Sequence, residues 1–395
     1  MSDTRREKLD SVQRRVNHAT PATPRGYPPE MRARIAAGAA VLLASGCWTP
    51  PRTVPALPAP LPAEGAATAA SEFAAEAAPR SPVEAWRIDA GRGFIGAPRV
   101  RAPIAVAAHT GREVIVRATA DGAVFWRRRV GSPITGLTVT GGVVYFAERS
   151  SRGIAHALDL TSSEELWTAR VRHARLAPVA IGDVIVFTND AGELQAFDAR
   201  TGDEQWTTPV GATLAVEPVR IDEELAVATI ADTLYVVAAD GTVPRRTPLP
   251  ATASAAPLPT THGLALPLHD GTVVLVSGDG VASTFGVGDV VLARPVHDGT
   301  DGIVVLTRAG ELWRIAAGVS TRFAQLGSAA TASLTRAANG YVVGLMNGAV
   351  MLIDRDGAVR WRIDTGQSID APAALDEGAL YVATRRGDLI KLVEG

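Results

Sequence analysis

A unit of about 39 residues occurs eight times between residue 83 and the end of the chain, and this period constrains the fold more than any other feature. One turn position recurs at Gly111, Gly153, Gly192, Asp232, Gly271, Gly310, Gly348 and Gly387. A second marker, usually an aromatic residue, recurs at Trp86, Trp126, Trp167, Trp206, Arg246, Phe285, Phe323 and Trp361. A third marker recurs at Pro98, Leu137, Pro178, Pro218, Pro257, Pro295, Ser333 and Pro372. Each marker therefore counts eight units.

The sequence within each unit is typical of β-strands. Short apolar runs such as VVYFA (143–147), VIVFT (184–188), IVVLT (303–307) and LYVAT (380–384) are separated by turn dipeptides such as Asp-Gly and Asn-Gly. A period of about 39 residues with four short strands is typical of a β-propeller blade. We therefore predict an all-β fold, an eight-bladed propeller of four-stranded antiparallel blades.

The two ends of the repeat region indicate how the ring closes. Gly387 is followed by a single strand, so the last unit lacks its outermost strand, whereas Trp86 lies on an outermost-type strand without the rest of its blade. Pairing of residues 84–89 with 388–393 would complete the eighth blade and leave no open edge. The innermost strands are expected after the third marker, at 97–100, 137–140, 178–181, 218–221, 257–260, 295–298, 333–336 and 372–375.

A motif identifies the type of blade. Residues 196–206 match A-x-D-x-x-T-G-[DE]-x-x-W, with the defining positions at Ala196, Asp198, Thr201, Gly202 and Trp206. It resembles the tryptophan-docking motif of the quinoprotein (PQQ-like) propeller repeat. Trp86, Trp126, Trp167 and Trp361 occupy the same docking position in other units. The Asp and Thr side chains would fix the turn between the two outer strands, and the Trp would pack between neighbouring blades. Arg246, Phe285 and Phe323 depart from the motif, so blades 4 to 6 are expected to be less regular.

The N-terminal part of the sequence carries a targeting signal. The uncharged run at 35–46 follows Arg32 and Arg34 and is too short to span a membrane. The run ends in Leu-Ala-Ser-Gly and is followed directly by Cys47; this sequence resembles a bacterial lipobox and predicts lipid attachment at Cys47. We interpret 31–47 as a lipoprotein signal peptide starting at Met31, 1–30 as a mis-annotated extension, 48–82 as a Pro/Ala-rich tether and 83–395 as the propeller.

Composition excludes several other classes of protein. The chain has 395 residues, 20% charged residues and a formal net charge of −2, which argues against a nucleic-acid-binding protein. The single cysteine rules out an internal disulfide framework and a thiol-rich zinc site. Lys8 and Lys391 are the only lysines, and no phosphate-binding P-loop is present. Neither a GxSxG nor an HExxH motif occurs.

The lipobox, tether and eight-bladed repeat together resemble the BamB family of outer-membrane protein assembly lipoproteins. This resemblance implies a non-catalytic scaffold without cofactor or metal, held at the periplasmic face of the outer membrane. The implied partner is a cell-envelope protein, namely the POTRA domains of a BamA-type barrel insertase. We expect a monomer that contacts the membrane through the lipid on Cys47. No residue in a recognised motif carries the partner contact.

Two alternative functions remain open from the sequence. A PQQ-dependent dehydrogenase shares the blade type, but the predicted innermost strands contain no Trp, Tyr or Phe and only one carboxylate, Asp298, whereas a calcium site needs six to eight oxygen ligands. A sensor or ligand-binding propeller is the second alternative, with Arg99, Arg220, His297, Asp298 and Arg336 as channel residues that could take an anionic ligand. The two His-Asp-Gly triplets at 269–271 and 297–299 are interpreted as turn chemistry, and Trp313 as packing between blades.

Overall fold

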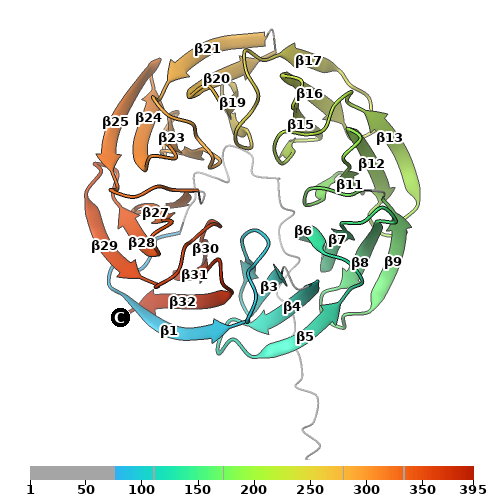
Figure 1. Cartoon of the computed structure of the whole chain (residues 1–395), viewed down its shortest axis with the longest axis horizontal. Helices are drawn as coiled ribbons and strands as arrows, with labels where there is room; N and C mark the ends of the chain where they lie inside the picture. The colour runs from blue at the N-terminus through green and yellow to red at the C-terminus, as the bar shows by residue number, and fades with distance from the viewer. Residues whose placement is uncertain (1–75, 110–111, 172, 279, 332–333) are drawn as a thin grey trace, which may run out of the picture. The chain divides into compact units, whose positions relative to one another are not determined.

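The computed structural model describes residues 76–395, except residues 110–111, 172, 279 and 332–333. The described residues form 32 strands in eight four-stranded antiparallel sheets. Figure 1 shows these sheets arranged around a common centre, with the chain passing from one blade to the next around the ring. The prediction of an all-β, eight-bladed propeller is confirmed.

Each blade runs from an inner to an outer strand. Blade 1 consists of β2 (Arg99–Arg101), β3 (Ile104–His109), β4 (Glu113–Ala118) and β5 (Val124–Arg129), and blade 2 of β6 (Ile134–Thr140), β7 (Val143–Glu148), β8 (Ile154–Asp159) and β9 (Glu165–Arg170). Blade 3 consists of β10 (Val179–Ile181), β11 (Val184–Thr188), β12 (Glu193–Asp198) and β13 (Glu204–Pro209). Blade 4 consists of β14 (Val219–Ile221), β15 (Glu224–Thr229), β16 (Thr233–Ala238) and β17 (Arg245–Pro248).

Again from inner to outer, blade 5 consists of β18 (Leu258–Thr260), β19 (Gly263–Pro267), β20 (Thr272–Ser277) and β21 (Gly280–Gly286), and blade 6 of β22 (Val296–His297), β23 (Ile303–Leu306), β24 (Glu311–Ala316) and β25 (Val319–Gln325). Blade 7 consists of β26 (Thr335–Ala337), β27 (Gly340–Gly344), β28 (Ala349–Ile353) and β29 (Val359–Asp364). Blade 8 consists of β30 (Ala374–Asp376), β31 (Ala379–Ala383), β32 (Asp388–Glu394) and β1 (Pro82–Asp89). All eight innermost strands overlap the segments expected from the third marker.

The eighth blade closes the ring as predicted. Strand β1 pairs antiparallel with β32 from Pro82↔Glu394 to Asp89↔Asp388, with a bulge between Glu84 and Trp86. The blade thus combines one strand from the beginning of the described chain with three from its end (Figure 1). Because β1 occupies the outermost position of the blade, β32 is paired on both sides.

The hydrophobic core is divided among the contacts between blades. The second and third strands are covered by neighbouring blades on both faces, so β27 and β28 are buried at every position. Strand β29 at the rim instead follows an alternating pattern of exposure. One cluster illustrates the arrangement, since Val114 and Val116 of blade 1 pack with Val144 and Phe146 of blade 2. This explains why the central strands read as uninterrupted apolar runs.

The seam between blades 8 and 1 contains several polar contacts. The Lys391 Nζ donates a hydrogen bond of 2.8 Å to the carbonyl oxygen of Thr119 and lies 5.6 Å from the ring centre of Tyr381. Trp86 also packs against Tyr381, with ring centroids 6.0 Å apart. None of the described segments forms a helix that is long and apolar enough to cross a membrane.

Candidate functional site

The docking motif of blade 3 builds a turn between β12 and β13. The Asp198 Oδ1 accepts hydrogen bonds from the backbone N–H groups of Arg200, at 2.9 Å, and Thr201, at 2.8 Å. The Thr201 hydroxyl donates to the Asp203 carboxylate at 2.8 Å. The N–H of Thr201, followed by that of Arg200 and the Thr201 hydroxyl, lowers the pKa of Asp198, although partial desolvation opposes this shift. The carboxylate is therefore part of the turn.

Four of the five docking tryptophans donate a hydrogen bond to the third-to-fourth strand turn of the following blade. The indole Nε1 of Trp126, Trp167 and Trp206 donates to the carbonyl oxygen of Leu160, Ala199 and Ala239, respectively, at 2.8 to 2.9 Å. Trp86 of blade 8 donates in the same way to Thr119 of blade 1, at 3.2 Å. These acceptors all lie at the turn between the third and fourth strands of the receiving blade. The motif therefore joins neighbouring blades.

Gly202 of the motif receives the tryptophan of the preceding blade. Its φ is +78°, and a Cβ atom at this position would lie 2.6 Å from Cδ2 of Trp167. Tyr145 reinforces the same contact, because its hydroxyl and the Trp167 indole both donate to the Ala199 carbonyl, each at 2.9 Å. Burial raises the pKa of Tyr145 to about 12, so the hydroxyl keeps its proton at neutral pH.

Irregularity is confined to a single blade among those that lack the tryptophan. The outer strand of blade 4 has only four residues and pairs with β16 without the bulge found in the other blades. Arg246 at the docking position lies over the ring of Tyr235, 5.5 Å from its centre. Blades 5 and 6 have seven-residue outer strands and keep the bulge. The expectation of irregular blades is therefore wrong for these two, in which a half-buried Phe occupies the docking position.

Residues 76–81 pack against blade 7. Ala78 is buried, and its backbone N–H and C=O both bond to the side-chain amide of Asn339, at 3.0 and 2.9 Å. The backbone carbonyl of Glu76 accepts a hydrogen bond of 2.8 Å from Ala338. The C-terminal part of the segment interpreted as a tether, 48–82, is thus part of the folded body, because these contacts hold it against blade 7. Cys47, the signal segment 31–47 and the extension 1–30 lie outside the described residues.

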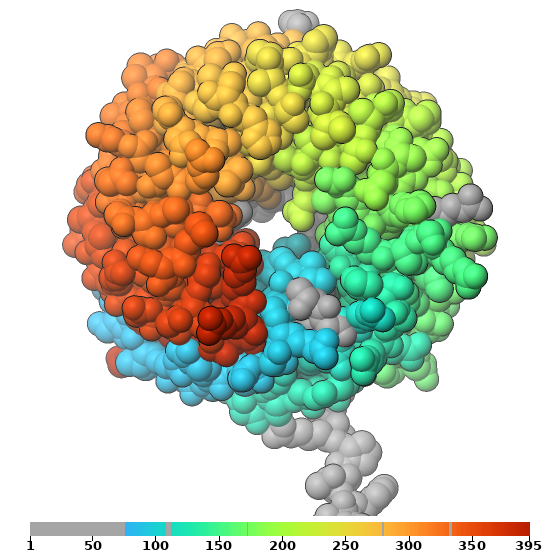
Figure 2. Space-filling view, viewed as in Figure 1, coloured from blue at the N-terminus to red at the C-terminus, as the bar shows by residue number. Residues whose placement is uncertain are grey.

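A cavity of about 770 Å³ lies inside the ring, where Figure 2 shows the blades leaving a central opening. Of the channel residues proposed from the sequence, Arg99, His297 and Arg336 line this cavity. Arg220 instead lines an adjoining cavity of about 240 Å³, and its guanidinium bonds to the Asp222 carbonyl at 2.6 Å and the Glu223 carboxylate at 2.9 Å. The structure thus brings three of the five residues together.

Asp298 does not line the channel, contrary to the expectation from its strand. Its side chain is buried in the turn after β22, where Oδ1 accepts hydrogen bonds from the N–H of Thr300, at 2.7 Å, and its hydroxyl, at 2.6 Å. The other oxygen lies 3.7 Å from Arg314 Nε. Asp270 forms a similar turn with Thr272. Both His-Asp-Gly triplets therefore serve turns, because each Asp carboxylate accepts hydrogen bonds from the Thr two residues later.

Three charged channel residues were not recognised from the sequence. Arg294, Glu217 and Asp370 line the central cavity together with the three predicted residues. Arg294 and Glu217 directly precede the third marker of their units, and Asp370 stands two residues before it. The signal in the sequence that could have identified these three residues is their place one or two positions before the third marker, because this part of the unit also faces the channel.

The described residues contain no group of three or more His, Cys, Asp or Glu side chains that could hold a metal ion. The eight innermost strands, as observed, contain no Trp, Tyr or Phe. Trp313 lies between blades 5 and 6, as expected, and its Nε1 donates to Glu311 at 3.1 Å.

A buried histidine in blade 2 was also missed from the sequence. His156 lies between two carboxylates, with Nε2 3.2 Å from Glu148 and Nδ1 3.1 Å from Glu165. Its ring stacks on Phe146, with centroids 4.8 Å apart. The two carboxylates contact different ring nitrogens, so the three side chains form a hydrogen-bonded triad in which His156 and Glu148 are buried and Glu165 is exposed.

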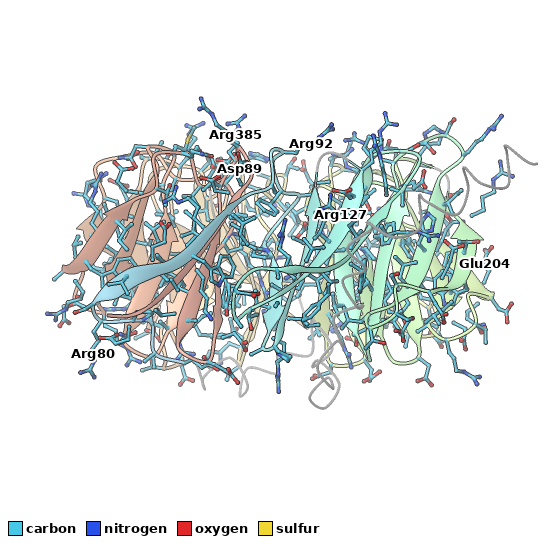
Figure 3. The ribbon with its side chains drawn as sticks, turned by 90° about the horizontal axis from the view of Figure 1, so that it is seen from below. Arg80, Asp89, Arg92, Arg127, Glu204 and Arg385 are labelled. Atoms are coloured by element: carbon cyan, nitrogen blue, oxygen red, sulfur yellow. The ribbon has the colours of Figure 1, made fainter. Side chains whose placement is uncertain are left out.

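Arginines gather on one face of blades 8, 1 and 2. This face carries the turns between second and third strands and the connections from blade to blade. Figure 3 shows Arg92 and Arg385 at this rim and Arg80 near the opposite one. The exposed members of this group, which we call the arginine arc, are Arg92, Arg112, Arg129, Arg149, Arg152, Arg170, Arg385 and Arg386.

Backbone contacts join the parts of the arginine arc. The guanidinium of Arg112 donates a hydrogen bond of 2.7 Å to the carbonyl oxygen of Gly131. The carbonyl of Pro133, in the same connection between blades 1 and 2, accepts a hydrogen bond from the backbone N–H of Arg149. At the seam, the N–H of Ala90 bonds to the carbonyl of Gly387 at 2.9 Å. Asp89 and Asp370 lie on the same face, and Asp370 is paired with Arg385 at 3.4 Å. The arc therefore carries an excess of positive charge.

The blade geometry and the tryptophan docking define the protein as a propeller of quinoprotein-type (PQQ-like) repeats. The family model described as outer membrane protein assembly factor BamB matches residues 75–217 and again residues 190–289, which together exceed half of the chain. The chain belongs to this family. No curated protein sequence matches it.

Solved structures share the architecture. BamB from Moraxella catarrhalis superposes with a TM-score of 0.66 at 14% identity, covering 79% of this chain and 99% of that one. The computationally designed Ika8 protein gives a TM-score of 0.67 at 14% identity, covering 78% and 98%. Sqt1 from Saccharomyces cerevisiae gives 0.65 at 12% identity, covering 80% and 100%. At these identities the likeness concerns the fold.

Proposed function

We propose that this protein is a non-catalytic, lipid-anchored scaffold of the bacterial envelope that binds other proteins during the assembly of outer-membrane β-barrel proteins. The proposed partner is the POTRA region of a BamA-type insertase. The observation that carries the proposal is the match of the family model for an outer membrane protein assembly factor over residues 75–289, within a complete eight-bladed ring.

The proposed location is the periplasmic face of the outer membrane, with the lipid on Cys47 as the anchor. The run at 35–46 and the following cysteine support this location. Twenty-nine positions separate Cys47 from Glu76, where the described body begins, so the chain between them could reach about 100 Å at full extension. Such a length allows the propeller to meet a partner away from the membrane surface.

The arginine arc is the surface that we assign to the partner. Charged patches steer association and select partners of opposite charge. Arg149 and Arg152 are both exposed in the turn region between β7 and β8. The described chain starts near the opposite rim, where Figure 3 places Arg80. The arc therefore lies on the rim opposite Arg80, and it fits a partner with an acidic surface.

The test is an affinity pull-down of the full chain from mildly detergent-solubilised envelopes, with proteins identified by mass spectrometry. Recovery of a POTRA-bearing barrel protein with the lipidated protein is the expected result, and a Cys47→Ser variant should recover less of it. Enrichment of a different envelope protein, with no POTRA-bearing protein, would contradict the assembly role and favour the sensor function.

The arc is tested in the same experiment by charge reversal. We expect the Arg149→Glu/Arg152→Glu double variant to recover markedly less partner. The matched control is Arg200→Glu/Arg362→Glu, which reverses two exposed arginines outside the arc. Equal recovery with both double variants, or equal loss, would refute the assignment of the arc while leaving the assembly role intact.

A further inference from the structure

A hollow between blades 5 and 6 lies where the docking system lacks its tryptophan. Its volume is about 90 Å³, and its walls are mainly apolar, with Ile303 and Ile315 of blade 6 among them. Phe285, at the docking position of blade 5, forms one wall, and Ala317 and Gly318 in the turn between β24 and β25 form another. Both turn residues are exposed, so the hollow opens to solvent on this side.

The turn glycine of blade 6 is uncovered, in contrast to its counterparts in neighbouring blades. In blade 4, a Cβ atom on Gly241 would lie 2.6 Å from Cδ2 of Trp206. In blade 7, a Cβ atom on Gly357 would lie 3.2 Å from Cδ2 of Phe323. Gly318 also has a positive φ, of +78°, yet no heavy atom of the described chain except its own chain neighbours lies within 4 Å of its Cβ position. The side chain at the docking position of blade 5 therefore leaves this turn open.

The same turn carries the acceptor that docking indoles use. In the receiving blades this acceptor is the carbonyl of the first residue after the third strand, namely Leu160, Ala199 or Ala239. Ala317 is the first residue after β24. None of the hydrogen bonds within the described part of the chain ends on its carbonyl, since Phe285 has no side-chain donor. Both the indole ring and its N–H are thus missing at this site.

We propose that the hollow between blades 5 and 6 binds the indole of a tryptophan side chain from a partner protein. The indole N–H would donate to the Ala317 carbonyl, and the ring would cover Gly318. An apolar cavity of about 150 Å³ encloses a whole benzene ring, so a hollow of about 90 Å³ takes one edge of an indole and leaves the rest at the opening. Tryptophan is enriched among the side chains that anchor protein interfaces.

Val319 favours a polypeptide over a free small molecule as the occupant. This residue follows Gly318, and with 60% exposure it is the most exposed large apolar residue of the described chain. Residues flanking a bound tryptophan would cover it, whereas a free indole would leave it in water. The turn lies on the face opposite the arginine arc, because successive turns of an antiparallel sheet alternate between its two ends. The inference therefore goes beyond the proposed function and does not depend on it.

The test is a ligand-observed NMR titration of the full chain in detergent, with detergent alone as the blank. The probes are a capped pentapeptide with tryptophan at its centre and alanine elsewhere, the same peptide with phenylalanine at the centre, and free indole. The tryptophan peptide should bind about fivefold more tightly than the phenylalanine peptide, which corresponds to one hydrogen bond of about 1 kcal/mol. It should also bind more tightly than free indole.

Three results of this titration would contradict the proposal. Absence of binding by the tryptophan peptide at millimolar concentration would overturn it, and so would equal affinity for the two peptides. Binding of free indole at least as tight as that of the tryptophan peptide would indicate a small-molecule site and overturn the assignment to a protein partner.

Substitution of Phe285 tests the location. The variant Phe285→Trp supplies the ring and the donor from the chain itself, so it should no longer bind the tryptophan peptide and should unfold at a higher temperature than wild type. The control Thr284→Trp places the same side chain at the neighbouring exposed position of β21 and should bind like wild type. Wild-type affinity of Phe285→Trp, or an equal loss in both variants, would overturn the proposal.

A cross-linking experiment on wild-type protein avoids the risk that Phe285→Trp fails to fold. The tryptophan peptide carries a benzophenone on the residue after tryptophan, and labelled positions are mapped by mass spectrometry after irradiation. Labelling should fall within 280–286 and 315–320, and an excess of the unmodified tryptophan peptide should suppress it. Labelling confined to other blades would overturn the proposed site.

Discussion

The indole Nε1 of Trp361 donates a hydrogen bond of 2.7 Å to the carbonyl oxygen of Pro79, a residue 282 positions earlier in the chain. In other blades the acceptor lies in the turn between the third and fourth strands. In the eighth blade these two strands, β32 and β1, come from opposite ends of the repeat region, so no such turn exists. The segment before β1 supplies the missing acceptor. Ring closure therefore includes the docking system as well as strand pairing.

Substitution Trp361→Phe removes this donor and keeps an aromatic ring. We expect a loss of about 1 kcal/mol in the free energy of unfolding, since this is typical of one hydrogen bond. Denaturant titration measures the loss, and hydrogen exchange should show faster exchange at the N–H of Ala78 and Ala338. Trp206→Phe is the matched control, because it should cost a similar free energy without altering exchange at those two residues. Unchanged exchange in Trp361→Phe would contradict the capping role of 76–81.

Substitution Gly202→Ala places a methyl group against the ring of Trp167. The position has a φ of +78° and no room for Cβ, so we expect a destabilisation of about 2–4 kcal/mol from strain and overpacking together. Gly366→Ala is the control, because Gly366 has a similar φ of +76° and nothing within 4 Å of its Cβ position. That variant should lose only the strain, about 1–2 kcal/mol. Thermal and denaturant unfolding compare the two, and equal losses would contradict the close contact.

Substitution Asp198→Asn tests the carboxylate of the docking turn. The pKa of Asp198 is lowered from 3.8 in the folded protein, so its stabilisation is present above this value and is lost as the pH falls below it. We expect the variant to be less stable than wild type near neutral pH and to lose less stability between pH 7 and about pH 3. Thermal unfolding at both pH values measures this difference. Asp183→Asn, at an exposed turn, controls for the loss of one charge, and parallel profiles of Asp198→Asn and wild type would refute the role.

Substitution His156→Leu removes the group between Glu148 and Glu165. The Glu148 carboxylate is buried, with 7% of its surface exposed, and would lose one of its two partners. We expect a destabilisation of about 2 kcal/mol in denaturant unfolding, because a buried charged acceptor is costly to leave unpaired. His269→Leu removes an exposed histidine and should change stability little. A stability of His156→Leu equal to that of the control would mean that the triad contributes nothing.

The ring closure could be predicted from the sequence because it depends on counting. The markers show that the last unit lacks one strand and that Trp86 belongs to a strand of the missing type, and β1 pairs with β32 as expected. The capping role of residues 76–81 could not be predicted. Their composition resembles a linker, and their order comes from contacts with Asn339 and Trp361, hundreds of residues away.

In the channel, too, some side chains could be predicted from the sequence and others could not. The segments expected after the third marker place Arg99 and Arg336 in the channel correctly. The same reasoning was wrong for Asp298, because this residue follows β22 and hydrogen bonds from Thr300 hold its carboxylate in the turn. It missed Arg294, because this residue directly precedes the expected segment.

The sequence by itself determined the repeat period, the number of blades, the docking tryptophans and the strand pairing that closes the ring. These features depend on local residue patterns and on the spacing between them, and both can be read directly from the order of residues in the sequence. Only the tertiary structure decided which cations face the channel, which arginines form the arc on one rim and which distant residue receives Trp361. Those features arise when the blades close into a ring, since closure brings together side chains whose separation in sequence carries no signal of their contact.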